Sequence, residues 1–185
     1  MPGGDPILGP FLGALLKVSL PAAALGLAPG PVQAIDDVYQ TPEAFLAEAF
    51  GAAPPPPQVM ELDAGLQSAL SQTLGHPFAQ SRLRYWRAAD KSAWIFDSIG
   101  KEGYQPTTAG FVIRGGAVEI ARVLIYRESR GEQVCERSFL RQFEGARAAG
   151  DGLDRAIDGI SGATYSVKMM QRMARAAISL DSAAR

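Results

Sequence analysis

Cysteine and histidine are almost missing from this sequence, which limits the chemistry that its own side chains can perform. The 185 residues include one cysteine, Cys135, and one histidine, His76. One cysteine cannot close an internal disulfide, and the two residues together cannot supply the ligands of a zinc site, an iron–sulfur cluster or a haem pair. Any redox chemistry of this chain would therefore depend on an organic cofactor.

The sequence also lacks an excess of charge of either sign. It contains 18 lysine and arginine residues and 19 aspartate and glutamate residues, a formal net charge of −1. This balance gives no electrostatic reason to expect nucleic acid as a partner. Aromatic residues such as Trp94 and Phe96 could stack on bases, but basic residues do not cluster around them, so packing in a core is the better interpretation.

Residues 1–34 have the pattern of an export signal. The apolar run from Val18 to Ala28 is followed by a break at Pro29-Gly30-Pro31, and Val32-Gln33-Ala34 is a small-x-small cleavage pattern. The run is too short to cross a bilayer on its own. We favour cleavage after Ala34 over a retained anchor, which predicts a periplasmic or other extracytoplasmic protein, either free or held at the membrane.

Residues 35–81 are predicted to form an N-terminal helical region that lies on the core. Thr41 and Pro42 begin a helix that extends to residue 50, the prolines at 54–57 form a stiff linker, and a second helix covers residues 63–74 before Gly75. The core is then expected to come from residues 82–181.

Residues 82–128 change to the alternating pattern of β-strands. The expected strands are residues 83–87, 93–99, 108–114 and 117–128, and Gly115-Gly116 has the composition of a tight hairpin turn between the last two. The last strand is the longest. Its Val123-Leu124-Ile125 is apolar on both faces, which is typical of a central strand.

Two helices are expected after these strands, at residues 136–149 and 167–180. Phe139, Leu140 and Phe143 would form the buried stripe of the first. Cys135 stands at its start, where a thiol can be reactive. A structural role is favoured, because the sequence has no second cysteine that could form a disulfide with an oxidised Cys135. We therefore predict an α+β fold in which both helices pack against an antiparallel sheet.

The stretch with the most chemical content precedes the last helix and reads Asp158-Gly159-Ile160-Ser161-Gly162-Ala163-Thr164-Tyr165-Ser166. Its small residues let a ligand approach the backbone closely. A helix that begins just after them would direct free N–H groups at an anion. From the residues alone, the stretch is a phosphate site in which Thr164 either contacts a phosphate or becomes bonded to it.

The same nine residues resemble the flavinylation motif of the FMN-binding domain family, which includes flavin subunits of the Na+-translocating quinone reductase and of the Rnf complex. The resemblance covers roughly residues 104–180, through the glycine hairpin, the strand that ends in Glu128-Ser129-Arg130-Gly131, and the segment Phe139–Gly145. In that family a phosphoester bond, made by a Mg2+-dependent flavin transferase, joins the motif threonine to FMN. The resemblance therefore implies FMN on Thr164 and a flavin transferase as a maturation partner.

The resemblance also suggests roles for the residues around Thr164. Asp158 would be the motif acid, which helps to present the loop to the transferase or its metal, and Gly162 and Ala163 would leave room for the phosphoribityl chain. Ser161 and Ser166 would bind phosphate oxygens, and Tyr165 and Glu128 complete the cofactor-binding candidates.

The turn after the long strand departs from the family pattern. The family more usually has Glu-Thr-Pro-Gly near the flavin ring, whereas this chain has Arg130 in place of the rigid residue. We expect a positive charge there to favour the reduced, anionic flavin.

The function implied is an exported flavoprotein that transfers electrons between a membrane-bound redox protein and an acceptor. A stand-alone reductase of a small extracytoplasmic substrate would need its own acid–base groups, and no second constellation in the sequence offers them, so a carrier is favoured. A non-flavinylated adaptor domain is the alternative from another functional class.

Overall fold

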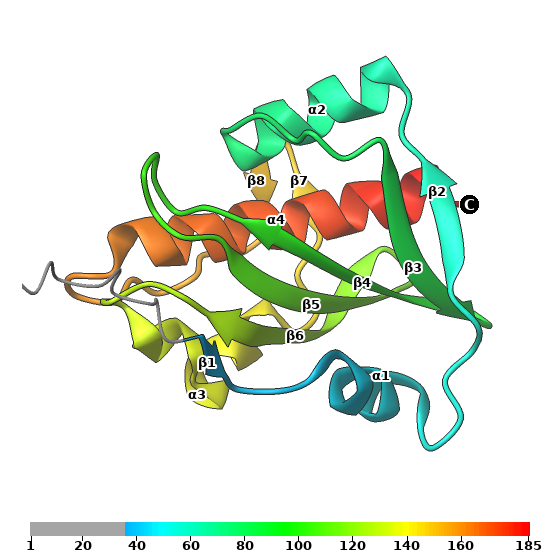
Figure 1. Ribbon diagram of the computed structural model, residues 1–185, viewed down its shortest axis with the longest axis horizontal. Helices are drawn as coiled ribbons and strands as arrows, with labels where there is room; N and C mark the ends of the chain where they lie inside the picture. Colours follow the sequence, from blue (N-terminus) through cyan, green and yellow to red (C-terminus); the bar gives the residue numbers. More distant parts are fainter. Residues whose placement is uncertain (1–35) are drawn as a thin grey trace, which may run out of the picture. The chain divides into compact units, whose positions relative to one another are not determined.

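The computed structural model describes residues 36–185, which lie within one compact unit of the chain. The apolar run Val18–Ala28 and the cleavage pattern at Ala34 lie outside the described residues. Within residues 36–185, no helix is long and apolar enough to cross a membrane. The predicted α+β fold is confirmed, because helices pack on both faces of an antiparallel sheet (Figure 1).

Six antiparallel strands form the main sheet in the order β1-β6-β5-β4-β3-β2. The long strands are β3 (Arg82–Ala88), β4 (Lys91–Ser98), β5 (Thr107–Arg114) and β6 (Ala117–Tyr126), and the short edge strands are β1 (Asp37–Val38) and β2 (Gln58–Glu61). Gly115 and Gly116 have φ values of 56° and 78°, as the predicted hairpin turn requires. The two edge strands extend the sheet beyond the predicted range of 82–128.

Helix α1 (Pro42–Phe50) packs on one face of the sheet. Thr41 is its N-cap, as predicted, and its Oγ1 accepts a hydrogen bond from the Ala44 N–H at 3.2 Å. The ring of Phe45 lies directly over β5, where a Cβ added to Gly110 would come within 2.7 Å of it. Glycine at this strand position therefore allows the close approach of the helix.

The opposite face is covered by α4 (Thr164–Ala183), and α2 (Ala64–Leu74) packs against α4 (Figure 1). Asp63 caps α2 by accepting from the Leu66 N–H at 2.8 Å, and Gly75 ends it in the left-handed conformation. The buried stripe of α4 includes Met170, Met173, Ala174 and Ala177. α4 begins earlier than the predicted residue 167 and ends later than the predicted residue 180.

The segment between β6 and α4 consists of short elements: η1 (Glu132–Cys135), α3 (Arg137–Leu140), η2 (Arg141–Phe143), β7 (Ala148–Ala149) and β8 (Gly152–Leu153). The prediction of one helix over residues 136–149 is therefore wrong beyond residue 143. The Val118 N–H donates to the Ala146 carbonyl at 2.9 Å, and the Gly145 N–H donates to the Val118 carbonyl at 2.7 Å. Pairing with β6 thus replaces helix, while Phe139, Leu140 and Phe143 are buried as predicted.

The longest strand, β6, is not the central strand that its apolar pattern predicts. It lies second from the edge, next to β1, whereas β5 is buried from Thr107 to Ile113 in the middle of the sheet. Both faces of β6 are apolar because α1 covers one of them, while α4 and the η1–α3–η2 segment cover the other. Burial on two faces is therefore not limited to central strands.

A buried carboxylate fixes the end of α4 against the sheet. Asp181 accepts hydrogen bonds from Ser92 Oγ at 2.6 Å and Arg87 Nη2 at 2.9 Å, and it also pairs with Arg185. A buried charge is stable only when it is paired and hydrogen-bonded in this way. The contacts hold the C-terminal turns of α4 on β3 and β4.

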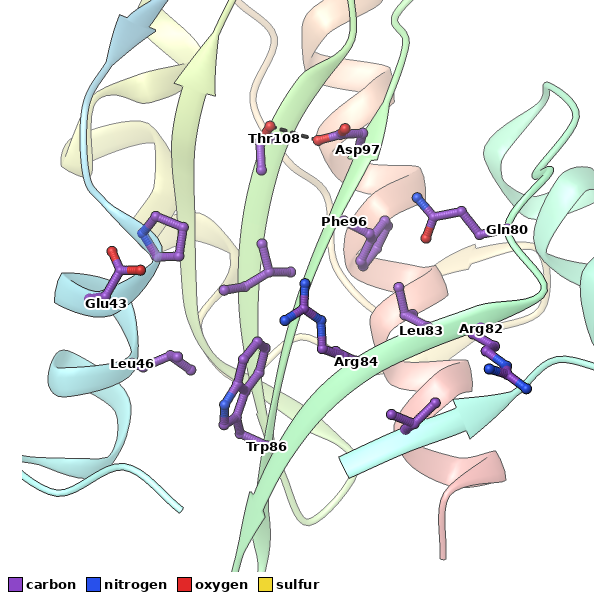
Figure 2. Close-up of a pocket in the computed structure, with 13 residues that line it drawn as sticks. Glu43, Leu46, Gln80, Arg82, Leu83, Arg84, Trp86, Phe96, Asp97 and Thr108 are labelled. Atoms are coloured by element: carbon purple, nitrogen blue, oxygen red, sulfur yellow. Dashed lines mark hydrogen bonds between the residues drawn. The ribbon is translucent and has the colours of Figure 1, made fainter. Parts of the chain in front are cut away.

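Part of the sheet face beside α1 is uncovered and forms a groove of about 700 Å³ (Figure 2). Trp86, Ile95 and Arg84 line it, and Asp97 at one end accepts a hydrogen bond from Thr108 at 2.6 Å. The nine-residue motif, all of which the structure describes, contributes no side chain to this groove. The motif therefore lies outside this groove.

Candidate functional site

The predicted site residues gather at one end of the sheet. The structure brings together the end of β6, the 99–106 loop between β4 and β5, and the start of α4 (Figure 1). These three segments come from different parts of the sequence, and each contributes groups around Thr164.

Thr164 is the first residue of α4. The Ala163 N–H donates to the Ile160 carbonyl at 3.0 Å and closes a tight turn, in which Gly162 has a φ of 80°. Apart from Gly162 itself and its two neighbours in the chain, no described residue has an atom within 4 Å of a Cβ placed on Gly162, so glycine is needed there for its backbone conformation and not for space. Thr164 is exposed to solvent.

The first turn of α4 has unused hydrogen-bond donors. No side chain caps the helix, and Val167 is the first residue whose N–H bonds back to the turn, at 3.0 Å from the Ala163 carbonyl. Within residues 36–185, the N–H groups of Thr164, Tyr165 and Ser166 therefore have no hydrogen-bond partner. Such donors, together with the positive end of the helix dipole, stabilise an anion such as a phosphate.

The turn after β6 packs directly onto this helix start. Gly131 has a φ of 87°, and a Cβ added there would come within 2.8 Å of Ser166 Oγ and 3.0 Å of the Tyr126 hydroxyl. The buried Tyr126 hydroxyl donates to the Arg130 carbonyl and lies 3.2 Å from Ser166 Oγ. Burial raises the pKa of Tyr126 to about 12, so the hydroxyl keeps its proton and holds the turn in place.

Glu128 lies beside the same serine with a half-buried carboxylate. Ser166 Oγ donates to its Oε2 at 3.4 Å, while Oε1 is buried and has no hydrogen-bond partner among the described residues. Burial raises the pKa of this carboxyl. The Ser166 hydroxyl and the nearby Gly100 N–H oppose this rise only in part. The Gly100 N–H does not form a hydrogen bond with Oε1. A buried oxygen without a partner can accept a hydrogen bond from a donor group of a ligand.

The 99–106 loop forms the other side of the site. A Cβ added to Gly100 would lie 3.3 Å from Glu128 Oε1 and 3.4 Å from the Tyr165 backbone, so the loop packs closely on both. Tyr104 and Tyr165 form a T-shaped aromatic pair with ring centroids 6.1 Å apart, and Lys101 Nζ lies 5.3 Å from the Tyr165 ring centroid. Gly100, Lys101 and Tyr104 are not recognisable as site residues in the sequence, because no local pattern indicates contacts with a helix so distant in the chain.

Asp158 and Ser161 lie outside this cluster of contacts. The Asp158 N–H donates to Gln142 Oε1 at 2.7 Å, and its exposed side chain borders a shallow pocket of about 260 Å³ that Phe139 also lines. Ser161 is exposed in the turn before α4. The structure therefore groups Glu128, Tyr165 and Ser166 around the start of α4 and leaves Asp158 accessible on the neighbouring surface.

Residues 103–179 match the model of the FMN-binding domain family. The chain contains an FMN-binding domain. The domain includes β5, β6 and the whole motif, and it is a flavin-binding module; β2, α2, β3 and β4 precede the matched region. No significant match was found among curated proteins or solved structures.

The residues of the FMN-binding domain fit this cofactor. The uncapped start of α4 suits the phosphate, and Gly131 lets the turn after β6 approach the helix start without a side chain in the way. Glu128 Oε1 offers a buried acceptor to a donor group of the ligand. These observations are independent of the family match and point to the same end of the sheet.

Proposed function

We propose that this protein is an exported electron-transfer flavoprotein in which a phosphoester bond joins FMN to Thr164. The observation that carries the proposal is the position of Thr164, an exposed residue that begins α4 inside the FMN-binding domain. A phosphate on Thr164 Oγ1 would lie beside the N–H groups of the first helical turn. These groups and the helix dipole stabilise its negative charge.

The chain's own residues would bind and orient the cofactor. FMN supplies one- and two-electron transfer, which the side chains of this protein cannot provide. Ser166 and Glu128 would set the polar contacts next to the helix start, and the exposed Lys168, one turn further along α4, would add positive charge near the phosphate. The exposed Asp158 would be available to the enzyme that attaches the cofactor.

Two classes of partner belong to this proposal. A Mg2+-dependent flavin transferase would load the protein, and a membrane-bound redox protein would exchange electrons with it. Export is supported by the apolar run Val18–Ala28 and the small-x-small pattern at Ala34. Covalent attachment suits an exported protein, because a freely dissociating cofactor would be lost by dilution outside the cell.

Co-expression with an active flavin transferase tests the proposal. After denaturing electrophoresis, the wild-type band should show flavin fluorescence under blue light, and Thr164→Ala should show none. Ser161→Ala is the matched control, because it removes the neighbouring exposed hydroxyl in the same turn and should keep the label. A fluorescent Thr164→Ala band would contradict the attachment site. A dark wild-type band, obtained with a transferase that labels its own substrate, would contradict covalent attachment altogether.

A further inference from the structure

Two exposed tyrosines lie beside the start of α4 and pack on each other. Tyr104 is 42% exposed and Tyr165 is 48% exposed, and their rings meet at an interplanar angle of 71°. Tyr165 directly follows Thr164 in the chain. Adjacent, exposed aromatic rings are a surface on which another planar aromatic ring can bind, because stacking removes apolar area from water on both partners.

The position of Tyr104 is fixed by contacts at the base of its loop. Its N–H donates to the Lys101 carbonyl at 3.0 Å, closing a turn in which Gly103 has a φ of 83°. Arg172 of α4 donates from Nη2 to the Ile99 carbonyl at 3.4 Å and to the Gly100 carbonyl at 3.2 Å. One guanidinium thus ties the loop to the same helix that begins at Thr164.

A second tie comes from the segment that follows α2. His76 Nε2 lies 2.8 Å from Ser98 Oγ, just before the loop. Both His76 and Ser98 precede the matched family region, so the part of the fold upstream of residue 103 contributes to the arrangement of the site. The aromatic pair therefore stands on a supported surface and not on a free loop.

We propose that Tyr104 and Tyr165 form the surface on which the isoalloxazine ring of the cofactor stacks, with Arg172 as the positioning residue that keeps Tyr104 in place. This inference rests on the proposed function, because attachment at Thr164 puts the ring within one phosphoribityl chain of Tyr165. The ring system of FMN is planar and aromatic, the chemistry that exposed tyrosines bind. Lys101, at 5.3 Å from the Tyr165 ring centroid, adds a positive charge to the same surface.

The test measures flavin fluorescence per covalently bound flavin in the folded, loaded protein. Tyrosine in contact with a flavin quenches its emission, so the wild-type protein should be dim until it is denatured. Tyr104→Leu and Tyr165→Leu should each raise the emission severalfold and change the circular dichroism of the flavin absorption bands. Trp86→Leu is the control, because it removes an aromatic ring from the groove on the α1 face (Figure 2) and should leave both signals unchanged.

Arg172 variants separate positioning from general destabilisation. Arg172→Met should brighten the flavin as Tyr104→Leu does, at unchanged flavin content, and Arg172→Lys should restore part of the quenching because a lysine can still donate to the loop carbonyls. If Tyr165→Leu prevents loading, Tyr104→Leu and the Arg172 pair still decide the question.

Unchanged emission and circular dichroism in the loaded Tyr104→Leu and Arg172→Met proteins would overturn the inference. Slower electron exchange with a membrane donor in those variants, with the flavin signals unchanged, would instead assign the tyrosines to partner binding and would equally overturn it. Failure of the proposed attachment gives a different result, since no variant would then carry covalent flavin on a denaturing gel.

Discussion

Replacing Gly131 with alanine tests whether the turn after β6 packs onto the start of α4. Gly131 is left-handed, with a φ of 87°, and that conformation costs a residue with a side chain about 1–2 kcal/mol. The added Cβ would also lie 2.8 Å from Ser166 Oγ, 3.0 Å from the Tyr126 hydroxyl and 3.1 Å from Ala163 Cβ. Because these groups are buried, relief of the overlap should cost about 1–3 kcal/mol more. We therefore expect the free energy of unfolding to fall by about 2–5 kcal/mol.

Urea unfolding of the flavin-free protein, followed by far-ultraviolet circular dichroism, measures this loss. Gly162→Ala is the matched control, because Gly162 has a φ of 80° and no described residue beyond its two neighbours in the chain has an atom within 4 Å of its Cβ position. In that variant the free energy of unfolding should fall only by the cost of the left-handed backbone conformation, about 1–2 kcal/mol. If Gly131→Ala lost no more than Gly162→Ala, the close contact between the turn and the helix would be refuted, and with it the grouping of Glu128 with Ser166.

Two other side chains give predictions by the same unfolding measurement. Burial raises the folded-state pKa of Glu128 above its unfolded value of about 4.5, so its ionisation destabilises the folded protein as the pH rises through that window. Glu128→Gln should therefore stabilise the protein at pH 7 relative to wild type, and a stability difference that stays the same at about pH 4 would contradict this origin. Asp181→Ala removes the carboxylate that accepts hydrogen bonds from Arg87 and Ser92. Because this leaves a partly buried arginine without its carboxylate partner, we expect the free energy of unfolding to fall by about 3–5 kcal/mol. A fall below about 1 kcal/mol, which is typical of a surface ion pair, would argue against the buried network.

Features with a local physical cause could be predicted from the sequence. Thr41 before Pro42 marks a helix start, because its hydroxyl satisfies a free N–H of the first turn, and the structure has that bond. Gly115-Gly116 marks a hairpin, because both residues must adopt positive φ. The anion site expected from the small residues and hydroxyl groups of residues 158–166 rests on the same kind of local reasoning, and it stays a prediction.

The segment after residue 143 could not be predicted in this way, because a long-range contact decides its structure. Residues 144–149 include three alanines, which favour helix, but Gly145 and Ala146 pair with Val118 of β6 instead, and Arg147 forms a bridge with Ala117. Hydrogen bonds to the sheet thus override helix propensity. The early start of α4 at Thr164 had no sequence signal either, since no side chain caps the helix there.

The composition of the site was only partly predictable for the same reason. Glu128 and Ser166 hydrogen-bond although they are 38 residues apart, and Tyr126 and Ser166 meet across 40 residues. Gly100 and Tyr104 join the site only because β4 ends, and β5 begins, beside the start of α4. A motif identifies the residues that carry the chemistry, whereas the fold supplies the surface around them.

Peptide mapping by mass spectrometry can locate the residue to which FMN is attached. The protein is co-expressed with a flavin transferase, digested, and fragmented so that the modified residue is located within the segment that contains Ser161, Thr164 and Ser166. We predict one added FMN, less one water, on Thr164 and on no other residue of that segment. The same mass on Ser161 or Ser166, or an unmodified segment from a protein loaded by an active transferase, would contradict it.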